Sequence, residues 1–182
     1  MSVRYRRSAV ALLALAVGIA AVLLWRDRSP SPTTVATLKA EMPGLIVADM
    51  KLLDLPADPA AQQQALDADK QGALREAVLR IWDRDAADDR LRDVAANRQL
   101  MVQDRTDVHD DVRVSVASWD DISGSAGSAD VRVTVRAAVR RATTGLWGDP
   151  GRTQWQFGLH KQIDGTWKLT SERVTAYLSG QG

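Results

Sequence analysis

The sequence predicts an α+β domain in which helices pack on one face of a curved antiparallel sheet of about four strands, behind an N-terminal transmembrane helix. Three observations predict this class. An uncharged apolar segment lies near the N-terminus, apolar residues recur at helical spacing through the middle of the chain, and they alternate strictly after residue 110. Helices with one apolar stripe and a sheet with one apolar face bury both surfaces by packing together.

The composition is that of a globular protein and excludes several kinds of site. The chain has 182 residues, of which 45% are hydrophobic and 26% charged, and it contains no cysteine. Disulfides, thiol catalysis and cysteine zinc sites are therefore excluded. The net charge of +1 is uneven, because residues 1–34 hold five arginines and one aspartate, which leaves −3 for the rest of the chain. A domain of that charge lacks the basic surface that binds nucleic acid, and no nucleic acid is expected as a partner.

The N-terminal segment predicts a membrane anchor. From Ser8 to Trp25 the chain runs 18 residues without a charge. A helix of that length rises about 1.5 Å per residue and spans ~27 Å, close to the ~30 Å hydrocarbon core. Three arginines precede it, which favours a cytoplasmic N-terminus, and Trp25 lies where interfacial tryptophans anchor a span. The predicted organisation is a basic cytoplasmic tail over 1–7, the anchor over 8–25, a linker over 26–34 and an exported domain over 35–182.

A cleaved signal peptide is the alternative interpretation of this segment. Its apolar region should be roughly 7–15 residues long and precede a small-x-small cleavage site. Here the apolar run is longer and ends in Trp-Arg-Asp-Arg, while Ser29 and Ser31 imitate a cleavage site among prolines. Either interpretation places the rest of the chain outside the cytoplasm. We therefore expect a single-pass protein of a bacterial plasma membrane with an extracytoplasmic C-terminal domain.

A short helix is expected directly after the linker. Residues Thr34 to Met42 are compatible with a helix, and Pro43 followed by Gly44 is a typical helix stop. The next stretch, residues 45–55, fits neither the helical nor the alternating period, so its structure is left open.

Longer helices are expected in the middle of the chain. Asp58 is suited to cap a helix that has Pro59 at its first position. The helix then carries one apolar stripe, made of Leu74, Ala77, Val78, Ile81 and Trp82. The stripe restarts out of phase at Ala87, Leu91, Val94 and Ala95. This change of phase predicts two helices, or one kinked helix, with the break near Asp83 to Asp85.

Four alternating runs predict an antiparallel meander with one buried face. They are 112–119, 131–139, 155–159 and 167–169, with connections over 123–128 and 143–151. Trp119 is expected in the core. The last connection contains Asp164-Gly165, which favours a two-residue turn, but that register would put the apolar residues of the two strands on opposite faces. A three-residue loop, Ile163 to Gly165 with a left-handed glycine, resolves the conflict and pairs His160 with Lys168 on the outer side.

This order of elements resembles the nuclear transport factor 2-like (cystatin-like) superfamily. The resemblance covers roughly residues 58–176 and is carried by the stripe from Leu74 to Trp82, the strands starting at Val112 and Val131, and IDGTWKLTSERV at its end. Two membrane-anchored branches share the layout of one span and one such domain. They are the actinobacterial proteins associated with mammalian-cell-entry (Mce) lipid transporters and the inner-membrane assembly component of type IV secretion systems. Membership of these branches implies a non-enzymatic assembly role. Other branches are enzymes, among them ketosteroid isomerases and polyketide cyclases, and fold alone does not choose between them.

No residue is predicted to be catalytic, to bind a cofactor or to hold a metal. His160 alternates out of phase with the apolar face of its strand and points outward. One carboxylate and histidine cluster could bind a cation, although its spacing does not match a Ca²⁺ loop and a polar helix-to-strand connection is the preferred interpretation: Asp104, Asp107, His109, Asp110 and Asp111. The charged stretch 83–93 is either an acidic binding patch or a solvated helix face with pairs Arg84–Asp88 and Asp88–Arg92.

One loop is a candidate for a partner contact. Leu146 and Trp147 lie between glycines at a hairpin tip, and aromatic anchors dominate interfaces. Alternatively, Trp147 folds back over the edge of the core. His160 is left for solvent or a partner.

Two hypotheses of function follow. The first is a non-enzymatic, membrane-anchored accessory or scaffold protein that binds other envelope proteins, with self-association compatible with it. The second is an exported enzyme or small-ligand binder that uses the space between helices and sheet, here called the cone. An open cone lined by Asp49, Asp120 or Asp121 would favour the second hypothesis.

Overall fold

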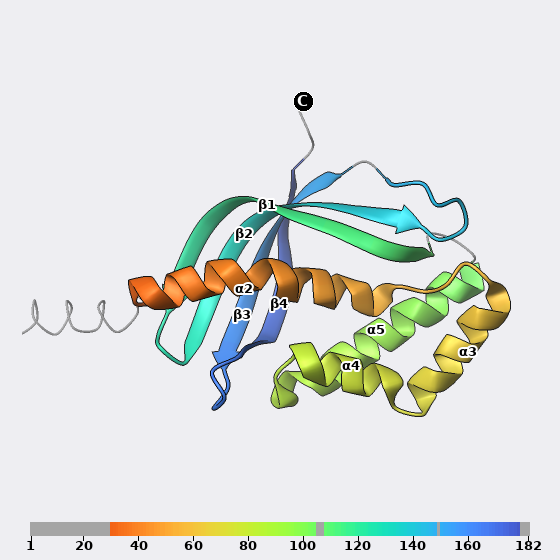
Figure 1. Cartoon of the computed structure of the whole chain (residues 1–182), viewed down its shortest axis with the longest axis horizontal. Coiled ribbons are helices and arrows are strands. Elements are labelled where there is room, and N and C mark those ends of the chain that lie inside the picture. Colours follow the sequence, from red (N-terminus) through yellow and green to blue (C-terminus); the bar gives the residue numbers. More distant parts are fainter. Residues whose placement is uncertain (1–29, 105–107, 149, 179–182) are drawn as a thin grey trace, which may run out of the picture.

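The computed structural model of the chain describes residues 30–104, 108–148 and 150–178. Within these residues, four α-helices and one 3₁₀ turn precede four strands (Figure 1), which confirms the α+β class. The elements are α2 Pro32–Met50, η1 Lys51–Leu53, α3 Pro59–Lys70, α4 Ala73–Ile81, α5 Arg84–Asp104, β1 His109–Gly124, β2 Ser128–Arg141, β3 Gly151–Lys161 and β4 Trp167–Leu178. The predicted anchor, from Ser8 to Trp25, lies outside the described residues. Within the described ranges, no helix is long and apolar enough to cross a membrane.

The four strands form one antiparallel sheet in the order β1-β2-β3-β4, as the alternating runs predict. The register brings Trp119 and Trp155 opposite Val133 on the side that faces the helices. Val131, Val133 and Val135 are fully buried there, and Trp119 packs against them half-buried. Figure 1 shows α2 crossing this face of the curved sheet, while α3, α4 and α5 gather to one side of it, with α4 and α5 in contact with β4.

The helix expected over Thr34 to Met42 is longer than the sequence suggests. It begins at Pro32, continues through Pro43 and Gly44, and ends at Met50, so the predicted stop is wrong. An interior proline costs about 3 kcal/mol or more. Against this, each fully buried aliphatic side chain contributes about 1.5–3 kcal/mol. The residues of α2 that face the sheet at helical spacing are all buried: Leu38, Met42, Ile46 and Asp49. Tertiary packing therefore outweighs the local stop signal, and the open stretch 45–55 becomes the end of α2 followed by η1.

The predicted cap of the next helix is confirmed. Asp58 is the N-cap of α3, its Oδ2 accepts a hydrogen bond from the Ala61 backbone N–H at 2.8 Å, and Pro59 occupies the first helical position. The side chain thus satisfies a backbone donor that the helix itself leaves without a partner.

Replacing Asp58 by alanine is expected to lower the free energy of unfolding by about 1 kcal/mol, because the Ala61 N–H loses its acceptor. Chemical denaturation of the full chain in detergent measures the change. The matched control is Gln64→Ala, an exposed position on the same helix, which is expected to change stability by less than about 0.5 kcal/mol. Equal effects of the two substitutions would contradict the role of the cap.

The helical layer has two breaks where the sequence predicts one. The first is at Gly72, which takes φ of 107° between α3 and α4, and the sequence analysis missed it. The second lies next to Asp83, as predicted. There Trp82 leaves the helix in an extended conformation and forms a parallel bridge with Leu169 of β4. The Asp83 N–H donates to the Leu169 carbonyl at 2.8 Å, so this break joins the helices to the last strand.

The hairpin between β3 and β4 has the predicted three-residue loop. Leu159 lies opposite Leu169, His160 opposite Lys168 and Lys161 opposite Trp167. The Gln162 N–H donates to the Thr166 carbonyl at 2.8 Å, and Gly165 takes φ of 90°. The apolar residues of both strands therefore share one buried face.

Gly165→Ala is expected to destabilise the domain by about 1 kcal/mol, because its positive φ disfavours any side chain although the space around it is open. Gly127→Ala is the matched control, since that position is also open and its φ is not positive. Thermal unfolding of both variants distinguishes backbone strain from a general effect of adding a methyl group. Equal melting temperatures would contradict the strain at Gly165.

Candidate functional site

A buried charge cluster lies in the cone between the helices and the sheet. Asp49, in the last turn of α2, is buried, and its carboxylate accepts three hydrogen bonds. Trp82 Nε1 donates to Oδ1 at 2.6 Å. Arg90 of α5 donates through Nε to Oδ1 at 3.1 Å and through Nη2 to Oδ2 at 2.6 Å. This bidentate arrangement, with the Trp82 donor added, occupies both carboxylate oxygens.

Glu172 of β4 completes the cluster. It lies opposite Phe157 in the register, on the face that lines the cone, and its carboxylate pairs with Nη1 of Arg90. Two carboxylates thus share one guanidinium in a largely buried place. Burial, followed by the charge of Asp49, raises the pKa of Glu172 to about 8, although Arg90 opposes the shift. Glu172 is therefore mostly protonated at neutral pH, and the cluster as a whole is close to neutral.

A hollow of about 250 Å³ between α5 and β4 reaches this cluster from the surface. Its lining includes Arg90, Asp93 and Glu172, together with Trp82, but it does not include Asp49. Asp49 is thus sealed from the hollow behind Arg90. The group exposed to the hollow is Glu172, a protonated acid that could donate a hydrogen bond to a ligand.

Asp120 and Asp121, the other two acids considered for the cone, lie elsewhere. Asp120 is exposed on the outer face of the sheet and accepts hydrogen bonds from Ser118, Thr134 and Gln154. The hydrogen bond from Ser118 is the main cause that lowers the pKa of Asp120. Asp121 is exposed as well. Arg90 and Glu172 were not predicted from the sequence. The register between β3 and β4 shifts between Gly158 and Leu159. Glu172 therefore does not follow the alternation of the preceding apolar residues of β4, which would have indicated that it faces the cone.

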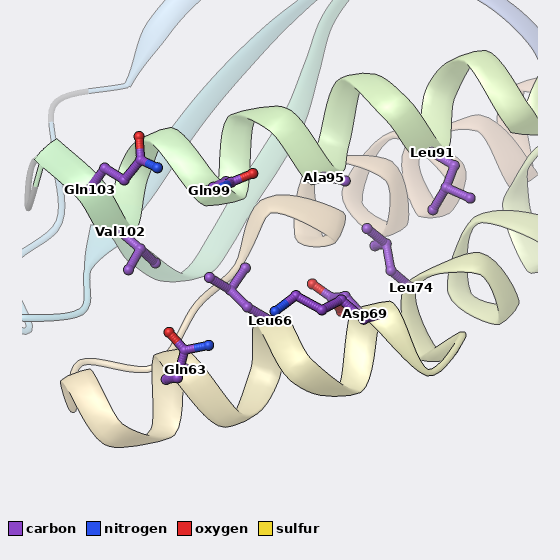
Figure 2. A pocket seen from close by; sticks show the side chains of 10 residues that line it. Gln63, Leu66, Asp69, Leu74, Leu91, Ala95, Gln99, Val102 and Gln103 are labelled. Carbon is purple, nitrogen blue, oxygen red and sulfur yellow. The ribbon is translucent and has the colours of Figure 1, made fainter.

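A second hollow of about 450 Å³ lies between α3 and α5 (Figure 2). Leu66 of α3 faces Ala95 and Val102 of α5 across this space, and polar side chains lie along it. Asp69 lines it and pairs with Arg98 at 3.3 Å, and burial raises the pKa of Asp69. This groove has apolar walls and a single acidic residue.

The ion pairs expected within the charged stretch 83–93 are not the ones that form. Asp88 pairs with Arg75 of α4 at 3.0 Å, and Arg92 pairs with Asp89 one turn away. Helix α4 lies beside α5 and supplies Arg75. The pair between Arg75 and Asp88 is a tertiary contact, which i,i+4 spacing within one helix does not predict. The stretch is therefore a solvated helix face whose acids are partly neutralised.

The loop with Leu146 and Trp147 folds back onto the outer face of the sheet. Trp147 bridges to Arg140, and Gly148 donates its N–H to the Val139 carbonyl at 2.9 Å. The guanidinium of Arg113 lies 3.9 Å from the centre of the Trp147 ring. Trp147 therefore covers the outer face instead of the expected core edge, while Leu146 stays 68% exposed.

The two histidines form pairs with aspartates. His160 points outward, as predicted, with Nδ1 2.8 Å from Asp83 Oδ2 and its side chain 56% exposed. That hydrogen bond is the main cause that lowers the pKa of Asp83. His109 Nδ1 lies 2.8 Å from Asp54 Oδ1. Asp107 lies outside the described residues, and among those described no three metal-type side chains come together.

Comparison with known proteins gives similarity to solved structures alone. No protein-family model matches the chain, and no curated protein matches it. A solved structure of a nuclear transport factor 2 (NTF2-like) superfamily protein from Salmonella enterica subsp. enterica serovar Typhimurium str. LT2 is similar, with a TM-score of 0.35 and 9% sequence identity. The similarity covers 48% of this chain and 62% of that chain, so the chain spans about three fifths of its length. A TM-score this low carries no argument about function.

Proposed function

We propose that the chain is a membrane-anchored accessory protein whose α+β domain binds other proteins of the cell envelope, and that it is not an enzyme. The observation that carries this proposal is the content of the cone. Apart from Asp49 of α2 and Glu172 of β4, the side chains that enter it from the sheet and from α2 are apolar and buried or half-buried, and its deepest acid, Asp49, is held by Trp82 and Arg90. Among the residues that the structure describes, a substrate in the cone would find no free base of the kind that acid–base catalysis requires.

The predicted anchor supports the same proposal. Helix α2 begins at Pro32, so only six residues separate it from Trp25. Pro30 lies in that short connection and favours extended backbone. A domain attached in this way stays close to the membrane surface, where other envelope proteins are concentrated. The resemblance to the two membrane-anchored branches of the nuclear transport factor 2-like superfamily leads to the same assignment.

Purification of the native complex tests this proposal. The full chain with an affinity tag is extracted from membranes with a mild detergent, and an untagged strain serves as control. We expect envelope proteins to co-purify in fixed proportion, and a second, differently tagged copy would reveal self-association. Recovery of the chain as a lone monomer would argue against the proposal. A C-terminal phosphatase fusion tests the topology separately, because that enzyme is active only outside the cytoplasm.

A second candidate function is a small-ligand binder that uses the hollow next to Glu172. The observation that favours it is the raised pKa of Glu172 beside Arg90, since shifted acids in clefts often mark binding or catalytic sites. Thermal-shift measurements with uncharged carbonyl compounds, on the wild type and on Glu172→Gln, test this candidate. Stabilisation of the wild type alone would support it. No stabilisation of either protein by any compound would leave the assembly role as the better explanation.

A further inference from the structure

Three arginines converge on the outer face of the sheet, away from the helices. Arg136 of β2 lies directly opposite Arg152 of β3, and Ser115 of β1 lies opposite Arg136 on the other side. Arg113, two residues before Ser115, is therefore the diagonal neighbour of Arg136 on the same face. All three arginine side chains are exposed.

This concentration of like charge is unfavourable to the fold. Like charges directly opposite each other in a sheet are destabilising. The ion pairs found among the described residues engage other arginines, namely Arg75, Arg90, Arg92, Arg98 and Arg140. The three arginines belong to residues 35–182, which together carry a net charge of −3. A stability cost that packing does not explain indicates a role in binding.

An aromatic wall adjoins the arginines. Trp147 stacks beneath Arg113 at 3.9 Å, and a hollow of about 420 Å³ is lined by both residues together with Arg136, Ala138 and Pro150. Leu146, next to Trp147, projects 68% exposed. The surface therefore combines positive charge with exposed apolar area. We call this surface, made of Arg113, Arg136, Trp147 and Arg152, the Arg–Trp face.

We propose that the Arg–Trp face docks an acidic segment of a partner protein, with carboxylates on Arg136 and Arg152 and an apolar side chain against Trp147 and Leu146. Guanidinium groups bind carboxylates through paired hydrogen bonds, and arginine and tryptophan are enriched where interfaces gain most of their energy. This inference rests on the proposed function, since it specifies where and by what chemistry an envelope partner binds.

The position of the face favours a protein over the membrane as its occupant. In Figure 1 the loop between β2 and β3 lies toward the end of the domain opposite the start of α2. Backbone hydrogen bonds from Ala142 to Val108 and from Leu55 to His109 attach that end to the chain just after α2. Helix α2 has 19 residues and is ~28 Å long, several times the ~8 Å screening length at physiological salt. The predicted membrane entry next to Pro32 thus lies at the other end of α2 from this loop.

Binding of a designed acidic peptide tests the proposal. The full chain is embedded in nanodiscs, and the probes are a fluorescent peptide of glutamate and leucine and its counterpart of glutamine and leucine. We expect the acidic peptide alone to bind, with weaker binding at higher salt. The double variant Arg136→Gln with Arg152→Gln should weaken binding by about 10- to 100-fold, the loss expected for two charge-assisted contacts. The control Arg75→Gln with Arg92→Gln removes two exposed helical arginines and should leave binding unchanged.

Several outcomes would overturn the proposal. They are equal binding of the neutral peptide, wild-type affinity in the Arg136 and Arg152 variant, and binding that does not respond to salt. The salt measurement uses the wild type, so it decides the matter even where a variant misfolds. Arginine-dependent binding to phosphatidylglycerol vesicles without peptide binding would assign the face to a lipid surface and would also overturn the proposal.

Co-purification separates this inference from the proposed function. If the wild type and the Arg136 and Arg152 variant recover the same partners, the face is not the docking surface and the assembly role stands. If the wild type recovers partners that the variant loses, while the control variant keeps them, both are supported. If the wild type recovers none, the assembly role fails, and the inference about its partner fails with it.

Discussion

Replacing Arg90 by methionine is expected to destabilise the folded domain by about 3–5 kcal/mol, the loss typical of removing one partner from a buried ion cluster. Arg90 is the cation shared by Asp49 and Glu172, and its side chain is 14% exposed. Without it, the buried carboxylate of Asp49 lies beside protonated Glu172 with no compensating charge. Methionine keeps much of the side-chain volume, so the effect reports charge more than packing. Urea denaturation of the full chain in detergent measures it.

Two further variants show whether charge is the cause. Arg92→Met, an exposed arginine on the same helix, should change stability by less than about 1 kcal/mol. Adding Asp49→Asn and Glu172→Gln to Arg90→Met should recover much of the lost stability, because no buried charge then remains uncompensated. A loss below about 1 kcal/mol in Arg90→Met, or no recovery in the triple variant, would mean that the cluster does not hold the helices on the sheet as described.

Raising the pH from about 5 to about 9 is expected to destabilise the wild-type domain, with a change on the order of 4 kcal/mol attributable to Glu172. In the folded state the pKa of Glu172 is about 8, whereas its ordinary value is 4.5. Between these values the folded state holds a proton that the unfolded state has released. The contribution of Glu172 is therefore fully present below about 4.5 and is lost as the pH rises through about 8.

Glu172→Gln is the matched control for this prediction. Glutamine imitates the protonated acid, so the variant should keep its stability across the same pH range and exceed the wild type at pH 9. Melting temperatures in a pH series measure both proteins. Aspartates with lowered pKa values, such as Asp83 and Asp164, lose their stabilising contacts only in strongly acidic solution and do not interfere. Parallel curves for the two proteins would contradict the assignment to Glu172.

The strands and their register could be predicted from the sequence because each depends on a short-range rule. Alternation places Val131, Val133 and Val135 on one face, and the requirement for a single buried face selects the three-residue loop ending at Gly165. The cap at Asp58 is local in the same sense. The length of α2 was not predictable in this way, since Pro43 and Gly44 signal an end that burial against the sheet overrides.

The candidate sites show the same division. Asp49 could be suspected as an acid in the chain, but its partners Trp82, Arg90 and Glu172 come from three other elements, and only folding brings them together. Leu146 and Trp147 were recognisable as a large apolar pair in a glycine-rich loop. Their neighbour Arg113 was not, because nothing in the sequence states which strand passes beneath that loop.

The sequence by itself therefore determined the α+β class, the strand order, the register of the last hairpin and the expectation of an N-terminal anchor, since periodicity and turn chemistry act within a few residues. Only the tertiary structure decided the extent of α2, the sharing of Arg90 between Asp49 and Glu172, and the meeting of Arg113, Arg136 and Arg152 with Trp147. These depend on contacts between residues far apart in the chain, where the gain from burying apolar surface and pairing charges outweighs local preference.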